Sequence, residues 1–353
     1  MEQAQTYTYM LASDLLSETV HCINKRYPFI LAGVNGKDSD EVVKILSDIY
    51  GAETPISVMT GDGKAYQIVL GMVYLEGENN TICFAPQTKL IDRTRFDFSD
   101  LEEILIRLRG EGGCEWDRAQ THESIRINLI EEAYELVEAI DLANKAMLLE
   151  ETGDVLLQAV FHTQIAKEEG MFNYSDRFTA VCRKLIDRHT HIFGTNHAEN
   201  AEQALNFWNE AKKKEKKYLS SADAMSRVPK NLPALLYAEK IQKIAKKVNF
   251  DFPDAKECYK KVLEELVEFN NAYSDANRVE EAGDVLFTVV NLLRFYHIDP
   301  EMALADANRK FFKRFDKVEQ IVTARGKKME ECTIEELDEI WNSDEVRSDK
   351  WVY

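Results

Sequence analysis

Two stretches carry the main structural signal of this chain: Leu129-Ile-Glu-Glu-Ala-Tyr-Glu135 and Leu149-Glu-Glu-Thr-Gly-Asp-Val-Leu-Leu157. Both return further along, as Val262-Leu-Glu-Glu-Leu-Val-Glu268 and Val279-Glu-Glu-Ala-Gly-Asp-Val-Leu-Phe287. Each copy therefore carries E-E-x-x-E followed by E-x-x-D. A repeat of this kind indicates that a two-helix unit was duplicated and that its acidic residues were retained in both copies.

The acidic residues of each copy share helix faces. Glu131 and Glu135 are four positions apart, and Glu151 and Asp154 are three apart, so each pair lies on one face of its helix. If the two helices pack antiparallel, the pairs face one another. Converging carboxylates repel one another unless a cation neutralises them, and an oxygen-only ligand set suits Mg²⁺ or Mn²⁺. One such motif alone is more often a solvated helix face, but two copies favour two metal sites.

A di-iron carboxylate bundle is the main alternative for acidic helices of this kind. That class of protein uses Glu-x-x-His motifs on facing helices. The match Glu18-x-x-His21 lies outside both copies. The sequence therefore argues against a di-iron site.

From Ser99 onward the sequence is helical in pattern. Ser99, with Glu102 three residues later, predicts a helix that begins there with a capping box. Apolar residues at helical spacing predict one series of helices at 123–144, 146–169, 175–192 and 199–217, and a second at 233–249, 254–274, 277–297 and 300–324. A polar stretch, residues 212–230, separates the two series. Its basic run, residues 212–217, favours a solvated helix end over a ligand site.

Residues 1–97 have a different character. Short β-like runs at 28–33, 56–59, 66–70 and 80–84 are separated by turns, several of them rich in Gly, and residues 38–50 show helical spacing of apolar residues. This alternation predicts a small α/β unit. The chain is therefore expected to be mainly α, with two tandem all-α repeats after a small α/β unit. The predicted domains are 1–97, 98–220 and 221–353.

Composition narrows the class of partner. The 353 residues include 44 Lys and Arg against 62 Asp and Glu, which gives a formal net charge of −18. Nucleic acids and anionic membranes are disfavoured as partners, because both require a basic surface. The N-terminus lacks a signal-peptide pattern, and no stretch is long and apolar enough to span a membrane. The scattered cysteines form no C-x-x-C pair, which predicts reduced thiols in a cytoplasmic protein; they are Cys22, Cys83, Cys114, Cys182, Cys258 and Cys332.

Over about residues 99–342, the sequence resembles the MazG family of nucleoside triphosphate (NTP) pyrophosphohydrolases in its two-repeat form. Besides the acidic motifs, the resemblance rests on Gly113-Cys-Glu-Trp-Asp-Arg-Ala-Gln-Thr-His122, Arg188-His-Thr-His-Ile-Phe193, Leu232-Pro-Ala-Leu235, Lys240-Ile-Gln-Lys243 and Asn308-Arg-Lys-Phe-Phe-Lys-Arg-Phe315. Glu115 departs from the pattern, since the family usually has proline there. The resemblance implies an all-α fold, a tight homodimer and Mg²⁺-dependent cleavage of an NTP between its α and β phosphates. The products would be a nucleoside monophosphate and pyrophosphate.

The resemblance also implies a set of catalytic carboxylates in each copy. The first set is Glu131, Glu132, Glu135, Glu151 and Asp154; the second is Glu264, Glu265, Glu268, Glu281 and Asp284. The expected ligands of Mg²⁺, or of Mn²⁺ in its place, are Glu132, Glu135, Glu151 and Asp154 in the first set and Glu265, Glu268, Glu281 and Asp284 in the second. When bound, the metal would bridge phosphate oxygens and lower the pKa of the attacking water. A glutamate that is not fully used as a ligand could act as general base.

The second copy is better equipped with cations for the phosphates. Lys261 lies three residues before Glu264, and Lys310 and Arg314 lie four apart on one helix face. The resemblance adds Lys212 and Trp341 to the substrate-binding residues, with Trp341 stacking on the base or, equally well, anchoring a C-terminal helix in a core.

Two aromatic segments have a structural alternative as well. Trp116 and Asp117 are expected either to shape the first site or to staple the loop that leads into the helix at 123–144. For His189 and His191 a structural role at a helix end is favoured over metal binding, because no fourth ligand is evident.

Residues 28–87 resemble the C-terminal half of a tetrapyrrole-methylase-type domain. The resemblance rests on Phe29-Ile-Leu-Ala-Gly33, Ile49-Tyr-Gly51 and Phe84-Ala-Pro86. The half that would hold the Gly-rich cofactor loop is missing, and Gly33-Val-Asn-Gly36 is too short to replace it. We therefore expect no methyltransferase activity and interpret this unit as a remnant with a dimer or docking role. For the whole chain, the alternative to an enzyme is a non-catalytic regulatory or scaffold protein that binds nucleotides.

Overall fold

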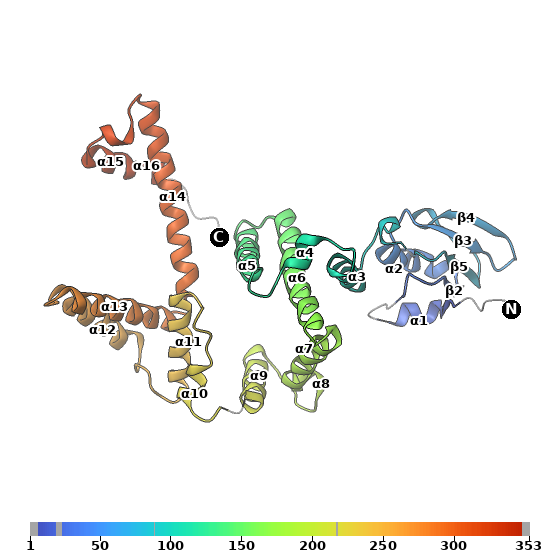
Figure 1. Cartoon of the computed structure of the whole chain (residues 1–353), viewed down its shortest axis with the longest axis horizontal. Helices are drawn as coiled ribbons and strands as arrows, with labels where there is room; N and C mark the ends of the chain where they lie inside the picture. Colours follow the sequence, from blue (N-terminus) through green and yellow to red (C-terminus); the bar gives the residue numbers. More distant parts are fainter. Residues whose placement is uncertain (1–5, 19–22, 88, 217, 348–353) are drawn as a thin grey trace. The chain divides into compact units, whose positions relative to one another are not determined.

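The computed structural model describes residues 6–18, 23–87, 89–216 and 218–347 and is mainly helical, with one small sheet near its N-terminus (Figure 1). It divides into two compact units, Met1–Ile186 and Asp187–Tyr353. His21 and Cys22 lie outside the described residues. Within the described part of the chain, no helix is long and apolar enough to cross a membrane. The predicted domain boundaries at 97/98 and 220/221 stay predictions.

The sheet has the strand order β1-β2-β5-β3-β4. Its strands are β1 (Thr8–Leu11), β2 (Phe29–Val34), β3 (Pro55–Met59), β4 (Ala65–Val69) and β5 (Asn80–Phe84). β1 pairs parallel to β2, and the other neighbours pair antiparallel. All four predicted strands are confirmed. β1 was not predicted, because it is a four-residue edge strand whose alternate side chains are exposed.

One face of this sheet packs on helices α1 (Ala12–Ser17) and α2 (Ser39–Tyr50) of the α/β segment. Burial alternates along β5, where Asn80, Ile82 and Phe84 point into the core, as expected for a sheet with one covered face. The Tyr50 ring stacks on Phe84 with ring centroids 4.1 Å apart. The predicted helix at 38–50 is confirmed as α2.

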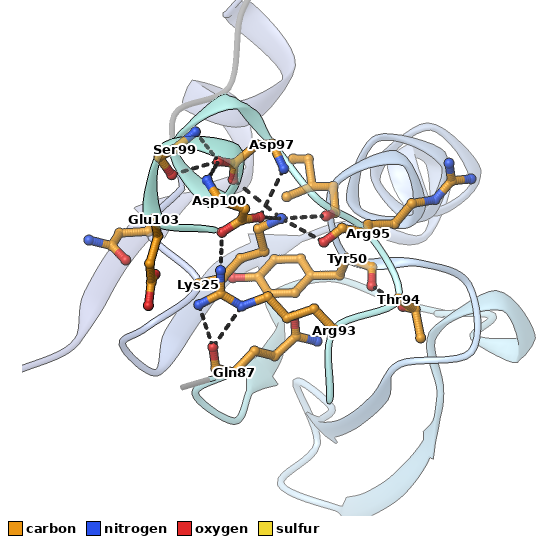
Figure 2. A network of polar contacts seen from close by, with 12 residues as sticks. Lys25, Tyr50, Gln87, Arg93, Thr94, Arg95, Asp97, Ser99, Asp100 and Glu103 are labelled. Atoms are coloured by element: carbon orange, nitrogen blue, oxygen red, sulfur yellow. Dashed lines mark hydrogen bonds and ion pairs between the residues drawn. The ribbon is translucent and has the colours of Figure 1, made fainter. Parts of the chain in front are cut away.

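A buried polar network joins this unit to helix α3 (Phe98–Arg109) (Figure 2). The Lys25 ammonium lies 3.3 Å from Asp97 Oδ2 and 3.5 Å from Asp100 Oδ2, and it donates to the Arg95 carbonyl oxygen at 3.1 Å. Arg93 is ion-paired with the same Asp100 and donates to the Gln87 carbonyl oxygen. The side chains of Lys25, Arg93 and Asp100 are each less than 5% exposed.

The start of α3 corrects one prediction. Asp97, not Ser99, is the N-cap, and Asp100, not Glu102, completes the capping box. Both positions fit the capping pattern, because Asp is as good an N-cap as Ser. Lys25 stabilises the carboxylates of Asp97 and Asp100, which places the helix start two residues earlier.

The rest of the first unit is a set of helices that follows the predicted series. They are α4 (Glu115–Ala119), α5 (Arg126–Asp141), α6 (Lys145–Glu168) and α7 (Tyr174–Arg188), whose last two residues cross into the second unit. α5 and α6 form a hairpin with a short turn at 142–144, and the Asn144 side chain caps α6. α6 also packs on α3, and their core includes Leu105, Val160 and Ile165.

The second unit contains another helical hairpin. Its helices are α8 (Thr190–Phe193), α9 (Ala201–Lys216), α10 (Ser221–Ser226), α11 (Ala234–Lys246), α12 (Ala255–Asn270), α13 (Asp275–Phe295), α14 (Pro300–Ala324), α15 (Ile334–Trp341) and α16 (Asp344–Arg347). α12 and α13 pack on each other and α11 packs on α13. Every predicted helix is confirmed, with ends that shift by up to four residues, except that residues 175–192 form two helices, α7 and α8. The described residues also include four short 3₁₀ turns, at Gly36–Asp38, Leu70–Met72, Leu90–Asp92 and Met329–Glu331.

Candidate metal centres

The α5–α6 hairpin brings three predicted ligands together. Oxygen atoms of Glu132, Glu151 and Asp154 lie within 4.8 Å of one another. Glu132 comes from α5, and the other two lie three residues apart on α6, so both elements of the motif are needed to build the cluster. Glu151 is 8% exposed, and among the described residues its buried Oε2 has no hydrogen-bond partner.

The electrostatics of this first cluster favour a cation. Burial, together with the negative charges of Asp154 and Glu135, raises the pKa of Glu132. Burial and the charge of Glu135 likewise raise the pKa of Glu151. Carboxylates held this close without a counter-ion are destabilised in their charged form, and a divalent cation would relieve the repulsion.

The α12–α13 hairpin builds the corresponding second cluster. Oxygen atoms of Glu265, Glu281 and Asp284 also lie within 4.8 Å of one another. Glu265 is 6% exposed. Asn277, one turn before Glu281 on α13, donates a hydrogen bond of 3.0 Å to its Oε1.

The fourth predicted ligand of each set borders its cluster. Glu135 and Glu268 are exposed on α5 and α12 and are not members of the three-residue clusters. Both are close enough to interact with their clusters. The charge of Glu135 raises the pKa of Glu132 and Glu151, and partial desolvation together with the charge of Glu265 raises the pKa of Glu268. Glu131 and Glu264 are exposed as well.

A lysine distinguishes the second cluster from the first. Lys261 Nζ lies 2.6 Å from Glu264 Oε1 and 2.9 Å from Glu265 Oε1. These two hydrogen bonds raise the pKa of Lys261, and the one to Glu264 contributes more. The structure therefore places Lys261 beside the carboxylates of the second cluster.

The other predicted substrate residues of the second copy gather on α14 and α15. The Arg314 guanidinium carbon lies 5.1 Å from the centre of the Trp341 ring, a cation–π arrangement. Trp341 also packs against the small core of Val318, Val322, Ile340 and Val346. The structure thus gives Trp341 a core contact and a cationic neighbour at once. Lys310 is exposed one turn before Arg314.

Lys212 lies on α9 and is partly buried, unlike the exposed Lys213, Lys214 and Lys216 that follow it. Burial first, and then the nearby charges of Lys216 and Arg188, lower the pKa of Lys212. The basic run is therefore mostly a solvated helix end, with Lys212 as its exception.

The Trp116 segment lies on the short helix α4, and the Trp116 ring is 64% exposed. Its neighbour Asp117 accepts a hydrogen bond from Arg109 through its backbone oxygen, and Arg109 also pairs with Glu168 of α6 at 2.7 Å. These contacts match the stapling alternative for this loop.

The histidines after α7 pack as a helix-end cluster. His189 precedes α8 and meets Trp208 edge-on, with ring centroids 4.8 Å apart, and the ring of His191 stacks on Phe207. Arg188 lies over Trp208 and pairs with Glu215 at 2.8 Å. These ring contacts give His189 and His191 the structural role at a helix end that the sequence favours.

Sequence reasoning missed the amide residues of both sites. Gln158 hydrogen-bonds Glu132 and is buried, and Asn277 binds Glu281. Each lies four positions from an acidic residue of its own helix, Asp154 and Glu281 respectively, so helical spacing was the available signal.

Comparisons with known proteins identify the family of this chain. The MazG nucleotide pyrophosphohydrolase domain matches residues 120–193, which include the first cluster. The nucleoside triphosphate pyrophosphohydrolase/pyrophosphatase MazG of Thermotoga maritima is 46% identical over 244 residues, 69% of this chain and 94% of that protein. The nucleoside triphosphate pyrophosphohydrolase of Escherichia coli K12 is 40% identical over 244 residues, 67% of this chain and 93% of that protein. The uncharacterized protein YabN of Bacillus subtilis is 40% identical over 268 residues, 75% of this chain but 55% of its own length. On these matches, the chain belongs to the MazG family of nucleotide pyrophosphohydrolases.

Proposed function

We propose that this protein hydrolyses nucleoside triphosphates to nucleoside monophosphate and pyrophosphate, using a divalent cation held by the carboxylates of its helical hairpins. The observation that carries the proposal is the pair of matching clusters, Glu132/Glu151/Asp154 and Glu265/Glu281/Asp284. Relatives at 40–46% identity, named for this activity, support it.

Mg²⁺ fits the residues present. Both clusters offer oxygen atoms alone, which suits a hard cation, and the buried Oε2 of Glu151 lacks any partner among the described residues. Glu135 and Glu268 would complete the ligand sets after a change of side-chain rotamer. A cation held by these carboxylates would make water a better nucleophile at neutral pH.

The protein's own side chains would handle the substrate. Lys261 would neutralise charge on the phosphates from beside the second cluster, and Lys310 and Arg314 would do so from α14. Trp341 would offer its ring to the base. Lys212 is proposed to bind substrate as well, because its ammonium is partly buried among other cations and an anion would stabilise it. One carboxylate that is not used as a ligand serves as general base.

We favour the second cluster as the main catalytic centre. Lys261 pairs with Glu265 there, whereas the corresponding position of the first copy is Asn128. Negative charge develops on pyrophosphate as it leaves the nucleotide. Cations beside the cluster stabilise this charge and so contribute directly to stabilising the transition state.

A homodimer is the proposed assembly. The α12–α13 hairpin exposes large apolar side chains at Leu263, Leu266, Val267, Leu286 and Phe287, each between 43% and 59% exposed. Exposed apolar surface of this extent on paired helices marks an interaction face. A second copy of the chain would cover it. We place the protein in the cytoplasm, a proposal that the five free cysteines of the described residues support.

Product analysis by ³¹P NMR tests the proposed function. Purified protein with an NTP and Mg²⁺ should yield pyrophosphate and the monophosphate in equal amounts, without orthophosphate. The runner-up, a non-catalytic nucleotide-binding regulator, predicts that an NTP analogue binds but that the NTP signals persist with Mg²⁺ and with Mn²⁺. Orthophosphate with a nucleoside diphosphate would contradict the proposed bond cleavage.

A further inference from the structure

The two clusters are matched in their acids but differ in one cation. Lys261 reaches both Glu264 and Glu265, and in the register of the repeat Asn128 takes its place in the first copy. Within the described parts of the chain, no Lys or Arg forms an ion pair with Glu132, Glu151 or Asp154, and Asn128 carries no charge to supply one. No cationic side chain of the described residues therefore balances the negative charge of the first cluster, whereas Lys261 supplies a positive charge to the second.

This difference changes what each cluster offers a metal ion. In the first, the buried Oε2 of Glu151 is free of any described partner. In the second, the buried Glu265 already has its Oε1 bound by an ammonium at 2.9 Å. A divalent cation that entered the second cluster would have to displace Lys261 from Glu265 or bind beside a positive charge, and both weaken its binding.

We propose that Lys261 is a built-in counter-ion, which weakens metal binding at the second cluster until the phosphates of a nucleotide draw its ammonium away, whereas the first cluster binds metal without nucleotide. The inference rests on the proposed function, because it takes the carboxylates as metal ligands and the NTP as substrate.

The chemistry of lysine suits this exchange. Its ammonium is a compact charge on a flexible stem, and Lys261 is only partly buried, with a third of its side chain exposed. Phosphate oxygens are charged acceptors that compete with a carboxylate for the same donor. Once Lys261 turns to phosphate, the Oε1 of Glu265 is released for the metal. Nucleotide and metal therefore strengthen each other's binding at the second cluster, and this coupling is reciprocal.

Mn²⁺ titration of the full chain without nucleotide, followed by electron paramagnetic resonance of free Mn²⁺, measures this asymmetry. We expect two classes of site per chain, the weaker at least about tenfold weaker than the other. Glu132→Gln should remove the tighter class and Glu265→Gln the weaker one. Lys261→Met should tighten the weaker class, and Asn128→Lys should weaken the tighter one.

Lys260→Met is the matched control. Lys260 is the neighbouring residue on α12 and pairs with Glu257 at 2.6 Å, outside the cluster, so its loss removes the same charge without freeing Glu265. It should leave both classes unchanged. Helix content by circular dichroism checks that each variant is folded.

A non-hydrolysable NTP analogue completes the test. Its addition should tighten the weaker class in the parent protein and leave the tighter class alone. Equal affinities at the two clusters, or a Lys261→Met variant that binds Mn²⁺ as the Lys260→Met variant does, would overturn the inference. The expected binding pattern without any release of pyrophosphate from NTP would leave this inference standing and contradict the proposed enzyme activity.

Discussion

Replacing Lys25 by Met tests how strongly the α/β unit is tied to the first helical segment. The Lys25 side chain is 3% exposed and supplies four contacts: the carboxylates of Asp97 and Asp100 and the carbonyl oxygens of Arg95 and Ile49 (Figure 2). Methionine keeps most of the volume but none of the charge. The substitution therefore removes the electrostatic contribution of this residue while the packing is largely retained.

The free-energy cost of Lys25→Met depends on the contacts that each carboxylate partner of Lys25 keeps. Loss of one member of a buried ion pair costs about 3–5 kcal/mol when the other is left alone. Asp100 keeps Arg93, and the Asp97 side chain is 46% exposed and keeps the hydroxyl of Ser99. The expected cost is therefore lower, about 2–3 kcal/mol, and it falls on the N-terminal turn of α3.

Hydrogen–deuterium exchange of the α3 amides is the appropriate assay, since it reports local stability where a global midpoint averages over both units. We expect exchange in Lys25→Met to be roughly 30- to 150-fold faster than in the parent protein. Lys64→Met is the control, because Lys64 pairs with Asp62 on the surface of the same unit and is 80% exposed. Lys64→Met should leave the exchange rates of the α3 amides unchanged. Equal exchange in the two variants would refute the reasoning that the network holds α3.

Three further outcomes are expected. Burial alone would raise the pKa of Asp97, but the hydrogen bond from Ser99 and the charge of Lys25 outweigh it and lower this pKa below its usual 3.8. The stabilising effect of Asp97 is therefore present above pH 3.8 and is lost as the pH falls through the lowered value. Acid unfolding of Asp97→Asn should accordingly depend less on pH in that range, and a slope equal to that of the parent would contradict this. Trp341→Leu should weaken binding of an NTP analogue roughly tenfold if the ring stacks on the base; unchanged binding with a lower melting temperature would leave it as a core anchor. EDTA should stop turnover, and Mg²⁺ at a hundred times its dissociation constant should stabilise the protein by about 2.7 kcal/mol, whereas a melting temperature that Mg²⁺ does not move would speak against metal binding.

Helical periodicity and the repeat made much of this fold predictable. All predicted strands and helices are present, and helices α12 and α13 lie within four residues of their predicted ends. Helix starts were harder, because several residues near one another can cap: Asp97 takes the position predicted for Ser99. β1 lies at an edge and pairs with only one strand, so its short sequence carried little signal of its own.

The candidate site was predictable in its members and not in its details. Glu132, the α5 member of the cluster, was named by the family resemblance. The spacing predicted only that Glu131 and Glu135 share a face opposite Glu151 and Asp154. It did not separate buried ligands such as Glu151 from exposed neighbours such as Glu131, because burial depends on how the hairpin packs on other helices. The pairing of Lys261 with two glutamates likewise depends on rotamers that sequence does not specify.

The proposal that the α12–α13 cluster is the catalytic centre is tested most directly by comparing pyrophosphate release from NTP by Glu265→Gln and Glu132→Gln, each at saturating Mg²⁺ and nucleotide. Glutamine keeps the size of either side chain and removes its charge. We predict that Glu265→Gln loses at least about a hundredfold in turnover, as expected for a group that stabilises the transition state. Glu132→Gln should retain most of the parent rate. The opposite pattern, with turnover abolished only in Glu132→Gln, would contradict the account and assign catalysis to the α5–α6 cluster.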